Sequence, residues 1–277
     1  MTRPLLALTA FLALAPAAPA QEPAPPPAPA AEESPYDRVE PDFALVALPT
    51  TLRLPRHRLV FRLTHRFTRP LDEGDFGDLA GDLFGLDSSA QVGFDLRFGL
   101  TATTQLGLYR TSDKTIQVSL QQELWRSARP AWALAAQGSL EGQDNFGEEL
   151  APALGLVASR RLGDRAALYL VPRWVGNTRA KGAAGEDDST FVLGFGARVR
   201  LGGDSYLVAD ASPRVAGYEG DGSQTVVGVG LEGGVGGHVF QLNVSTGLGT
   251  TPAQLARGED GGARAWRLGF NLSRKFY

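Results

Sequence analysis

The C-terminal stretch from Ala265 to Tyr277 alternates apolar and polar side chains. One face of this stretch would carry the apolar residues Trp266, Leu268, Phe270, Leu272 and Phe276. Such period-two alternation predicts a β-strand with one apolar and one polar side. A strand that ends a chain exposes an unpaired edge, and pairing with the first strand closes a barrel whose apolar face lies in lipid. The end of the chain therefore predicts a closed transmembrane barrel.

Alternating segments of the same kind recur from Arg56 onward. The predicted strands are 57–67, 89–97, 102–110, 115–125, 131–140, 150–160, 165–175, 190–201, 205–212, 224–233, 238–248 and 264–276. Most are close to the ~9–11 residues that a tilted strand needs to cross the hydrocarbon. The sequence thus predicts an all-β fold, a transmembrane antiparallel up-and-down β-barrel. Twelve strands are preferred, and ten to fourteen stay open.

The connections between these strands alternate in length. Short turns such as 98–101 and 202–204 alternate with mostly long loops such as 68–88 and 249–263. Outer-membrane barrels have short periplasmic turns and long external loops, so an even strand count places both chain ends in the periplasm. The tryptophans fall near strand ends and predict an aromatic girdle at the membrane interfaces, although Trp125 has the inward parity of its strand. The predicted girdle is Trp125, Trp132, Trp174 and Trp266.

The N-terminus predicts export. Residues 1–20 combine Arg3, an apolar run and the small-residue site Ala18-Pro19-Ala20, which is typical of a bacterial signal peptide. Residues 21–45 are rich in proline and alanine and predict a disordered periplasmic linker, which leaves 46–277 for the barrel. The absence of cysteine excludes disulfides and thiolate metal sites, and a net charge of −3 gives no indication of a nucleic-acid partner. We expect localisation in the bacterial outer membrane, with lipid and the barrel-assembly machinery as partners.

The predicted inward face carries an excess of arginine. This basic wall of the lumen consists of Arg62, Arg66, Arg97, Arg173, Arg198, Arg200 and Arg267. The first long loop carries the opposite charge and includes a possible short helix from Phe76 to Phe84. We predict that this loop either plugs the lumen or is solvated outside; its acidic residues are Asp72, Glu73, Asp75, Asp78, Asp82 and Asp87.

Many predicted inward positions are small and leave space in the lumen. They are Gly93, Gly107, Ala133, Ala135, Gly155, Gly194, Gly196, Gly228, Gly230 and Gly269. This space is either open or filled, and the pattern of residues does not decide between the two. We also expect the final strand to carry the signal read by the assembly machinery, in Phe270, Leu272, Phe276 and Tyr277, with Phe276 more important than Tyr277.

The first third of the predicted barrel resembles an uncharacterised family of bacterial outer-membrane β-barrel proteins. The resemblance rests on Thr64-His65-Arg66-Phe67, on the loop sequence 82–88 (Asp-Leu-Phe-Gly-Leu-Asp-Ser), on Gly99-Leu100-Thr101 and on Tyr109-Arg110-Thr111. It extends from about Leu48 to the C-terminus. It implies an outer-membrane barrel and no particular biochemical activity.

Three functions fit these patterns. The first is a narrow porin-like channel for small polar solutes, with a mild anion preference from the arginines. The second is a non-conducting structural or scaffold barrel that binds a periplasmic or surface partner, for example a periplasmic protein through the proline-rich linker. The third is a lipid-modifying enzyme with His65 as a base, but no partner motif accompanies this histidine, and we expect no enzyme, cofactor or metal site.

Overall fold

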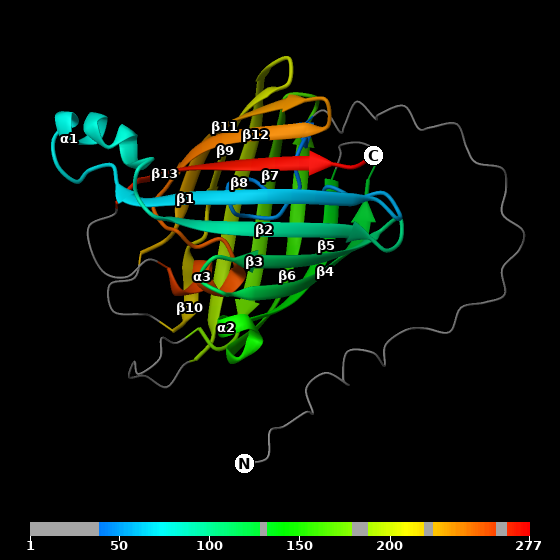
Figure 1. The fold of residues 1–277 in the computed structure, drawn as a ribbon. Helices are drawn as coiled ribbons and strands as arrows, with labels where there is room; N and C mark the ends of the chain where they lie inside the picture. Colours follow the sequence, from blue (N-terminus) through cyan, green and yellow to red (C-terminus); the bar gives the residue numbers. More distant parts are fainter. Residues whose placement is uncertain (1–38, 128–131, 179–187, 219–223, 259–264) are drawn as a thin grey trace, which may run out of the picture. The chain divides into compact units, whose positions relative to one another are not determined.

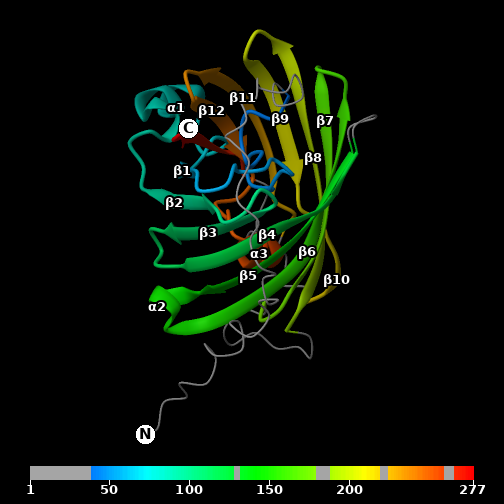
Figure 2. The same ribbon diagram turned by 90° about the vertical axis from the view of Figure 1, so that its right-hand side faces the viewer.

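The computed structural model describes residues 39–127, 132–178, 188–218, 224–258 and 265–277. The predicted signal peptide and residues 21–38 of the predicted linker lie outside the described residues. Residues 33–277 form one compact unit. Its architecture is a sheet of antiparallel strands that closes on itself (Figure 1, Figure 2).

The twelve predicted strands are all present, with ends that differ by a few residues, and one short additional strand, β10 (Arg214–Gly217), lies in a predicted loop. The strands are β1 (Leu59–Pro70), β2 (Ala90–Gly99), β3 (Thr104–Thr111), β4 (Ile116–Arg126), β5 (Trp132–Gly142), β6 (Glu148–Leu162), β7 (Ala166–Val175), β8 (Thr190–Gly202), β9 (Ser205–Ala211), β10 (Arg214–Gly217), β11 (Val227–Val235), β12 (His238–Ser245) and β13 (Arg267–Lys275). Each strand pairs antiparallel with its neighbours, which confirms the predicted up-and-down barrel.

The last strand closes the barrel on the first. Residues of β13 pair with β1 in antiparallel register, from Val60 opposite Lys275 to Arg66 opposite Gly269. Both β9 and β10 pair with β8, so they are two parts of one ring position separated by Ser212 and Pro213. Proline has no N–H for a ladder hydrogen bond, which accounts for the interruption. The ring therefore has twelve strands, as the sequence predicts.

The two ends of the barrel differ as expected from the loop lengths. We call the end with the tight turns, such as 203–204 and 236–237, the short-turn end, and the opposite end the long-loop end. Short helices occur at the long-loop end: α1 (Phe76–Gly81), followed by the 3-10 turn Leu83–Gly85, α2 (Gln143–Phe146) and α3 (Pro252–Arg257). Within the described ranges, no helix combines the length and the apolar character needed to cross a membrane.

The outer face of the barrel is apolar and the inner face is polar. Leu154, Phe195 and Leu242 are 63%, 46% and 59% exposed on the outside, whereas Arg66, Arg198 and Gln241 are at most 2% exposed inside. In water this distribution would leave a continuous apolar surface, and in lipid it satisfies both faces.

The tryptophan predicted to point inward, Trp125, points outward. The pairing of β4 with β5 shifts register between Glu123 and Trp125, so Leu124 is an extra residue in a β-bulge. The bulge reverses the side-chain alternation, and Trp125 is 54% exposed. Trp132 and Trp174 are 39% and 41% exposed, and Trp132 stacks with Arg160, whose guanidinium lies 5.0 Å from the ring. Trp266 is half-buried just before β13.

Candidate functional site

The lumen contains a hairpin formed by residues 39–54, which we call the lumen hairpin. Its tip is a tight turn in which Leu45 N–H donates to Leu48 O (2.8 Å) and Thr50 N–H donates to Phe43 O (3.0 Å). The return arm continues to the first residue of β1 at the short-turn end. Figure 2 shows this blue segment within the ring of strands. Residues 39–45, which the sequence assigned to a disordered linker, are therefore part of the barrel's interior.

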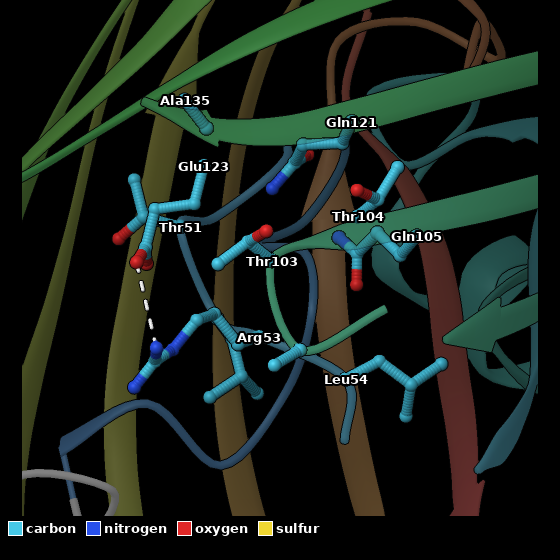
Figure 3. Close-up of a pocket in the computed structure, with 11 residues that line it drawn as sticks. Thr51, Arg53, Leu54, Thr103, Thr104, Gln105, Gln121, Glu123 and Ala135 are labelled. Atoms are coloured by element: carbon cyan, nitrogen blue, oxygen red, sulfur yellow. Dashed lines mark hydrogen bonds and ion pairs between the residues drawn. The ribbon is translucent and has the colours of Figure 1, made fainter. Parts of the chain in front are cut away.

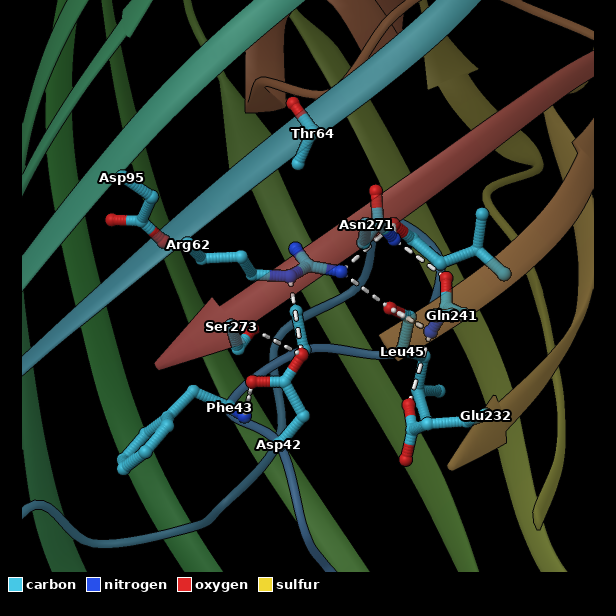
Figure 4. Close-up of polar contacts among 12 residues, drawn as sticks. Asp42, Phe43, Leu45, Arg62, Thr64, Asp95, Glu232, Gln241, Asn271 and Ser273 are labelled. Carbon is cyan, nitrogen blue, oxygen red and sulfur yellow. Dashed lines mark hydrogen bonds and ion pairs between the residues drawn. The ribbon is translucent and has the colours of Figure 1, made fainter. Parts of the chain in front are cut away.

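Two acidic residues of the hairpin form ion pairs with the wall. Arg62 of β1 contacts Asp42, with 3.2 Å between Nε and Oδ2, and Ser273 of β13 donates to the same carboxylate at 2.9 Å (Figure 4). Glu40 accepts hydrogen bonds from Arg161 Nε at 2.6 Å and from Tyr169 Oη at 2.8 Å. Both carboxylates are at most 1% exposed. Burial of a charge is tolerated only when it is paired and hydrogen-bonded, and here both conditions are met.

The hairpin backbone has no regular strand partner, and wall side chains satisfy its carbonyl groups instead. Each donor reaches inward from a strand: Arg198 to Ala44 O (2.9 Å), Arg62 to Leu45 O (2.8 Å), Arg66 to Val46 O (3.1 Å), Gln121 to Thr50 O (3.1 Å) and Arg126 to Thr51 O (2.6 Å). In the other direction, the Asp210 carboxylate accepts from the N–H groups of Ala47 and Leu48 at 2.7 and 2.9 Å. Buried backbone groups need such partners, so the wall matches the hairpin group by group.

Apolar side chains of the hairpin pack where the wall has glycines. A Cβ added to Gly194 would lie 2.9 Å from Leu48 Cδ1, and one added to Gly228 would lie 2.7 Å from Val46 Cγ1. A Cβ added to Gly196 would overlap Leu45 Cδ1. Leu45, Val46 and Leu48 are at most 1% exposed and form one cluster with wall residues such as Val157 and Val208. Three of the small inward residues predicted to leave space therefore make room for the hairpin, whereas others, such as Gly93 and Gly107, make room for side chains of the wall.

The return arm of the hairpin lies against β3 and β4 near the short-turn end. Arg53 Nη1 is 3.4 Å from Glu123 Oε1, and the space between Leu54, Gln105 and Gln121 forms a narrow gap of about 230 Å³ (Figure 3). Arg53 is exposed, so this ion pair contributes little to stability. The gap is therefore a packing space between the hairpin and the neighbouring strands.

The last long loop covers the lumen from the other end. Thr251 caps α3 and forms a capping box with Gln254, and Pro252 occupies the first turn of the helix. Leu255 and Ala256 are at most 3% exposed, and the wall residue Glu141 accepts hydrogen bonds from Thr251 Oγ1 at 2.8 Å and Ala253 N at 3.1 Å. The short helix is thus fixed inside the barrel mouth (Figure 2).

A polar chamber remains between the lumen hairpin and the α3 loop. It has about 550 Å³ of empty space, part of it open to solvent. The hairpin contributes Ala44, Ala47 and Pro49, the α3 loop contributes Thr250 and Pro252, and the wall contributes the other lining residues: Arg62, Thr64, Asp95, Arg97, Tyr109, Gln117, Ser119, Gln137 and Arg173.

A family model described as a membrane bound beta barrel domain (DUF5777) matches residues 42–276. The chain belongs to this family. The matched region of the DUF5777 barrel begins at Asp42, inside the lumen hairpin, rather than at β1.

Solved structures with a distant likeness to this DUF5777 barrel include three membrane proteins. A triple mutant of Rhodopseudomonas blastica porin has 12% identity and a TM-score of 0.35, covering 67% of this chain and 55% of its own. Outer membrane phospholipase A from Escherichia coli has 14% identity and a TM-score of 0.43, with 81% and 94% coverage. LpxR from Salmonella typhimurium has 12% identity and a TM-score of 0.36, with 78% and 99% coverage. The chain thus spans about half the porin's length. A comparison with curated proteins found no match.

Four of the seven predicted lumen arginines bind the hairpin of the DUF5777 barrel. Arg62, Arg66 and Arg198 are described above, and Arg97 Nη1 donates to Phe43 O at 3.3 Å while its Nε pairs with Asp95. Arg173 faces the chamber. The other two lie at the barrel ends, where Arg200 donates to Gly203 O (2.5 Å) and Arg267 to Thr68 O (3.1 Å).

The acidic loop does not plug the lumen. Its predicted helix is present as α1, but Phe76 and Leu83 are 74% and 54% exposed, and the loop projects away from the barrel (Figure 1). Its charges act locally: Asp75 and Asp78 form the capping box of α1, Asp82 pairs with Arg69, and Asp72, Glu73 and Asp87 are exposed. The plug prediction is wrong because the hairpin already supplies acidic groups to the inward arginines.

The predicted assembly signal and the histidine have clear positions. Phe270 and Leu272 are half-buried on the outer face, and Phe276 and Tyr277 are exposed just beyond β13. Their role in assembly stays a prediction. His65 stacks on Phe270 at 4.7 Å between ring centroids, in apolar surroundings.

Several polar residues that hold the hairpin are not predicted from the sequence to have this role. They are Glu40 and Asp42 in the hairpin and Arg161, Tyr169, Asp210, Glu232, Gln241 and Asn271 in the wall. One signal was available: the apolar run Phe43–Leu48 is out of place in a solvated linker. Such a run beside two acidic residues indicates a segment that has to be buried and paired.

Proposed function

We propose that this protein is an outer-membrane barrel closed to solutes by its own lumen hairpin. In this proposal it works as a membrane anchor that holds the chain preceding the hairpin at the periplasmic face. The single observation that carries the proposal is the occupied lumen, in which ion pairs, backbone acceptors and glycine gaps of the wall all match residues 39–54. A segment held by so many matched contacts is a permanent part of the barrel.

A second candidate is a channel in which the hairpin is a movable gate. The chamber favours this candidate, because Arg62, Arg97 and Arg173 line a polar space that is partly open to solvent. Such a channel would pass small polar solutes with a mild anion preference, as the arginine excess predicts.

Recordings in planar bilayers separate the two. The full chain should show no conductance steps at any voltage that the bilayer tolerates, and a variant lacking residues 39–54 should show steps with anion preference. Deletion of residues 72–87 is the matched control, since this loop lies outside the lumen and its loss should leave the barrel closed. If the full chain shows spontaneous conductance steps and the 39–54 deletion shows the same steps, both candidates are contradicted. If the full chain shows steps only at high voltage, the result favours the movable gate.

A further inference from the structure

One arginine in the chamber is buried and makes no direct ion pair with a described carboxylate. Arg62 pairs with Asp42, and Arg97 Nε pairs with Asp95 at 2.8 Å. Arg173 is only 6% exposed, and its hydrogen bond goes to the neutral amide of Gln137, at 2.8 Å between Nη2 and Oε1. Among the described residues, no carboxylate lies within 4 Å of its guanidinium. The nearby Glu141 instead accepts from Thr251 and Ala253.

The register of three neighbouring strands positions the Arg173 side chain at the chamber. In the sheet register, Gln137 of β5 lies opposite Gly155 of β6, and Gly155 lies opposite Arg173 of β7. A Cβ at Gly155 would be 3.1 Å from Arg173 Cβ. The glycine thus lets the Arg173 side chain cross β6 and reach Gln137. Three neighbouring strands cooperate to hold a single guanidinium at the chamber surface.

The Glu141 carboxylate acts on Arg173 only through space and is already hydrogen-bonded to Thr251 and Ala253, so the guanidinium can still take a direct anionic partner. The chamber lining also offers hydrogen-bond donors, from the hydroxyls of Ser119 and Thr250 and the amide of Gln117, while Tyr109 Oη donates to Thr250 Oγ1 at 2.8 Å and Asp95 is paired with Arg97. Guanidinium groups bind carboxylate and phosphate oxygens through two parallel hydrogen bonds, and hydroxyl and amide donors complete the shell of such an anion.

We propose that the chamber is a binding site for a small oxyanion, with Arg173 as the charge that binds it and Gln137 as the residue that positions Arg173. The ligand class is a soluble carboxylate or phosphate group small enough for the chamber. A lipid headgroup does not fit, because the chamber is lined by the lumen hairpin, the α3 loop and buried polar residues of the strands such as Arg62, Thr64 and Asp95, and not by the exposed apolar residues of the outer face. The site does not depend on whether the lumen conducts.

Isothermal titration calorimetry on the full chain in detergent tests the site, with sodium phosphate and sodium acetate as separate probes and sodium chloride at equal ionic strength as background. We expect wild type to bind at least one of the two oxyanions, and Arg173→Gln to weaken that binding at least tenfold. Arg110→Gln, which removes an exposed arginine outside the chamber, should bind like wild type. The two probes separate a carboxylate ligand from a phosphate ligand.

A second variant tests the site independently in case Arg173→Gln does not fold. Gln137→Met removes the residue that positions Arg173 and keeps its charge, and it should weaken binding several-fold with the barrel folded, as judged by heat-modifiable electrophoretic mobility. The proposal is overturned if wild type binds neither probe at millimolar concentration, or if both folded variants bind as tightly as wild type.

Discussion

Replacing Arg198 by alanine should lower the free energy of unfolding of the barrel by about 3–5 kcal/mol, the range for breaking a buried ion pair from one side. Arg198 and Glu232 are both 0% exposed at the side chain, with 3.0 Å between Nε and Oε1. The guanidinium also donates to Ala44 O at 2.9 Å. The substitution therefore leaves a buried carboxylate without its cation and a hairpin carbonyl without its donor. Urea unfolding in lipid vesicles, followed by tryptophan fluorescence, measures the change.

The exposed pair on the same barrel is the control for this prediction. Arg53 and Glu123 are 3.4 Å apart, but Arg53 is 48% exposed at the side chain, so Arg53→Ala should lower stability by about 1 kcal/mol or less. The double variant Arg198→Met/Glu232→Leu removes both buried charges and should recover much of the lost stability. Equal effects of Arg198→Ala and Arg53→Ala would show that the buried pair does not hold the lumen together.

Replacing Gly196 by valine should displace the tip of the lumen hairpin. Gly196 of β8 faces Leu45, and a side chain at this position would occupy the space of the Leu45 methyl group. Overpacking of a filled core costs about 1–3 kcal/mol, and the hairpin can relieve it by moving away from the wall. Hydrogen exchange of the hairpin amides should therefore become faster, while the strand amides keep their protection.

Two further variants make this prediction specific. Gly233→Val on β11 adds the same side chain at a position with no atom within 4 Å and should leave hairpin exchange as in wild type. Leu45→Ala combined with Gly196→Val makes room for the valine, so the pair should be less destabilising than the sum of the single changes. If the changes in the free energy of unfolding were instead additive, Leu45 and Gly196 would not be in contact.

The strand pattern was predictable because lipid imposes it locally. A strand with one face in lipid must alternate, so Phe240, Leu242 and Val244 fall on one side and Gln241 and Asn243 on the other whatever the rest of the chain does. The exception is Trp125, because a bulge adds one residue and reverses the parity in a way that the alternation itself does not reveal.

The site was not predictable because its contacts join distant parts of the chain. Asp42 and Ser273 are 231 residues apart in sequence, and Ala47 and Asp210 are 163 apart. The hairpin has no repeating pattern, since apart from the bonds at its tip its backbone groups bond to individual side chains of the wall and not to a ladder. The inward arginines and glycines leave open whether the lumen is filled, and the sequence suggests the acidic loop as the acidic segment that could fill it. Only the burial of Glu40 and Asp42 shows that the hairpin fills it instead.

An engineered disulfide between the hairpin and the wall tests the occupied lumen most directly. Thr51 Oγ1 and Ser159 Oγ are 2.5 Å apart and buried, so cysteines at both positions would place two sulfurs close to the 2.05 Å of a disulfide. The chain has no cysteine of its own, so any bond formed is the designed one. After mild oxidation of the folded Thr51→Cys/Ser159→Cys protein, mass spectrometry should find the two peptides linked, and Thr51→Cys/Ser89→Cys should give no link. Free thiols at positions 51 and 159 in the folded barrel would contradict a lumen closed by residues 39–54.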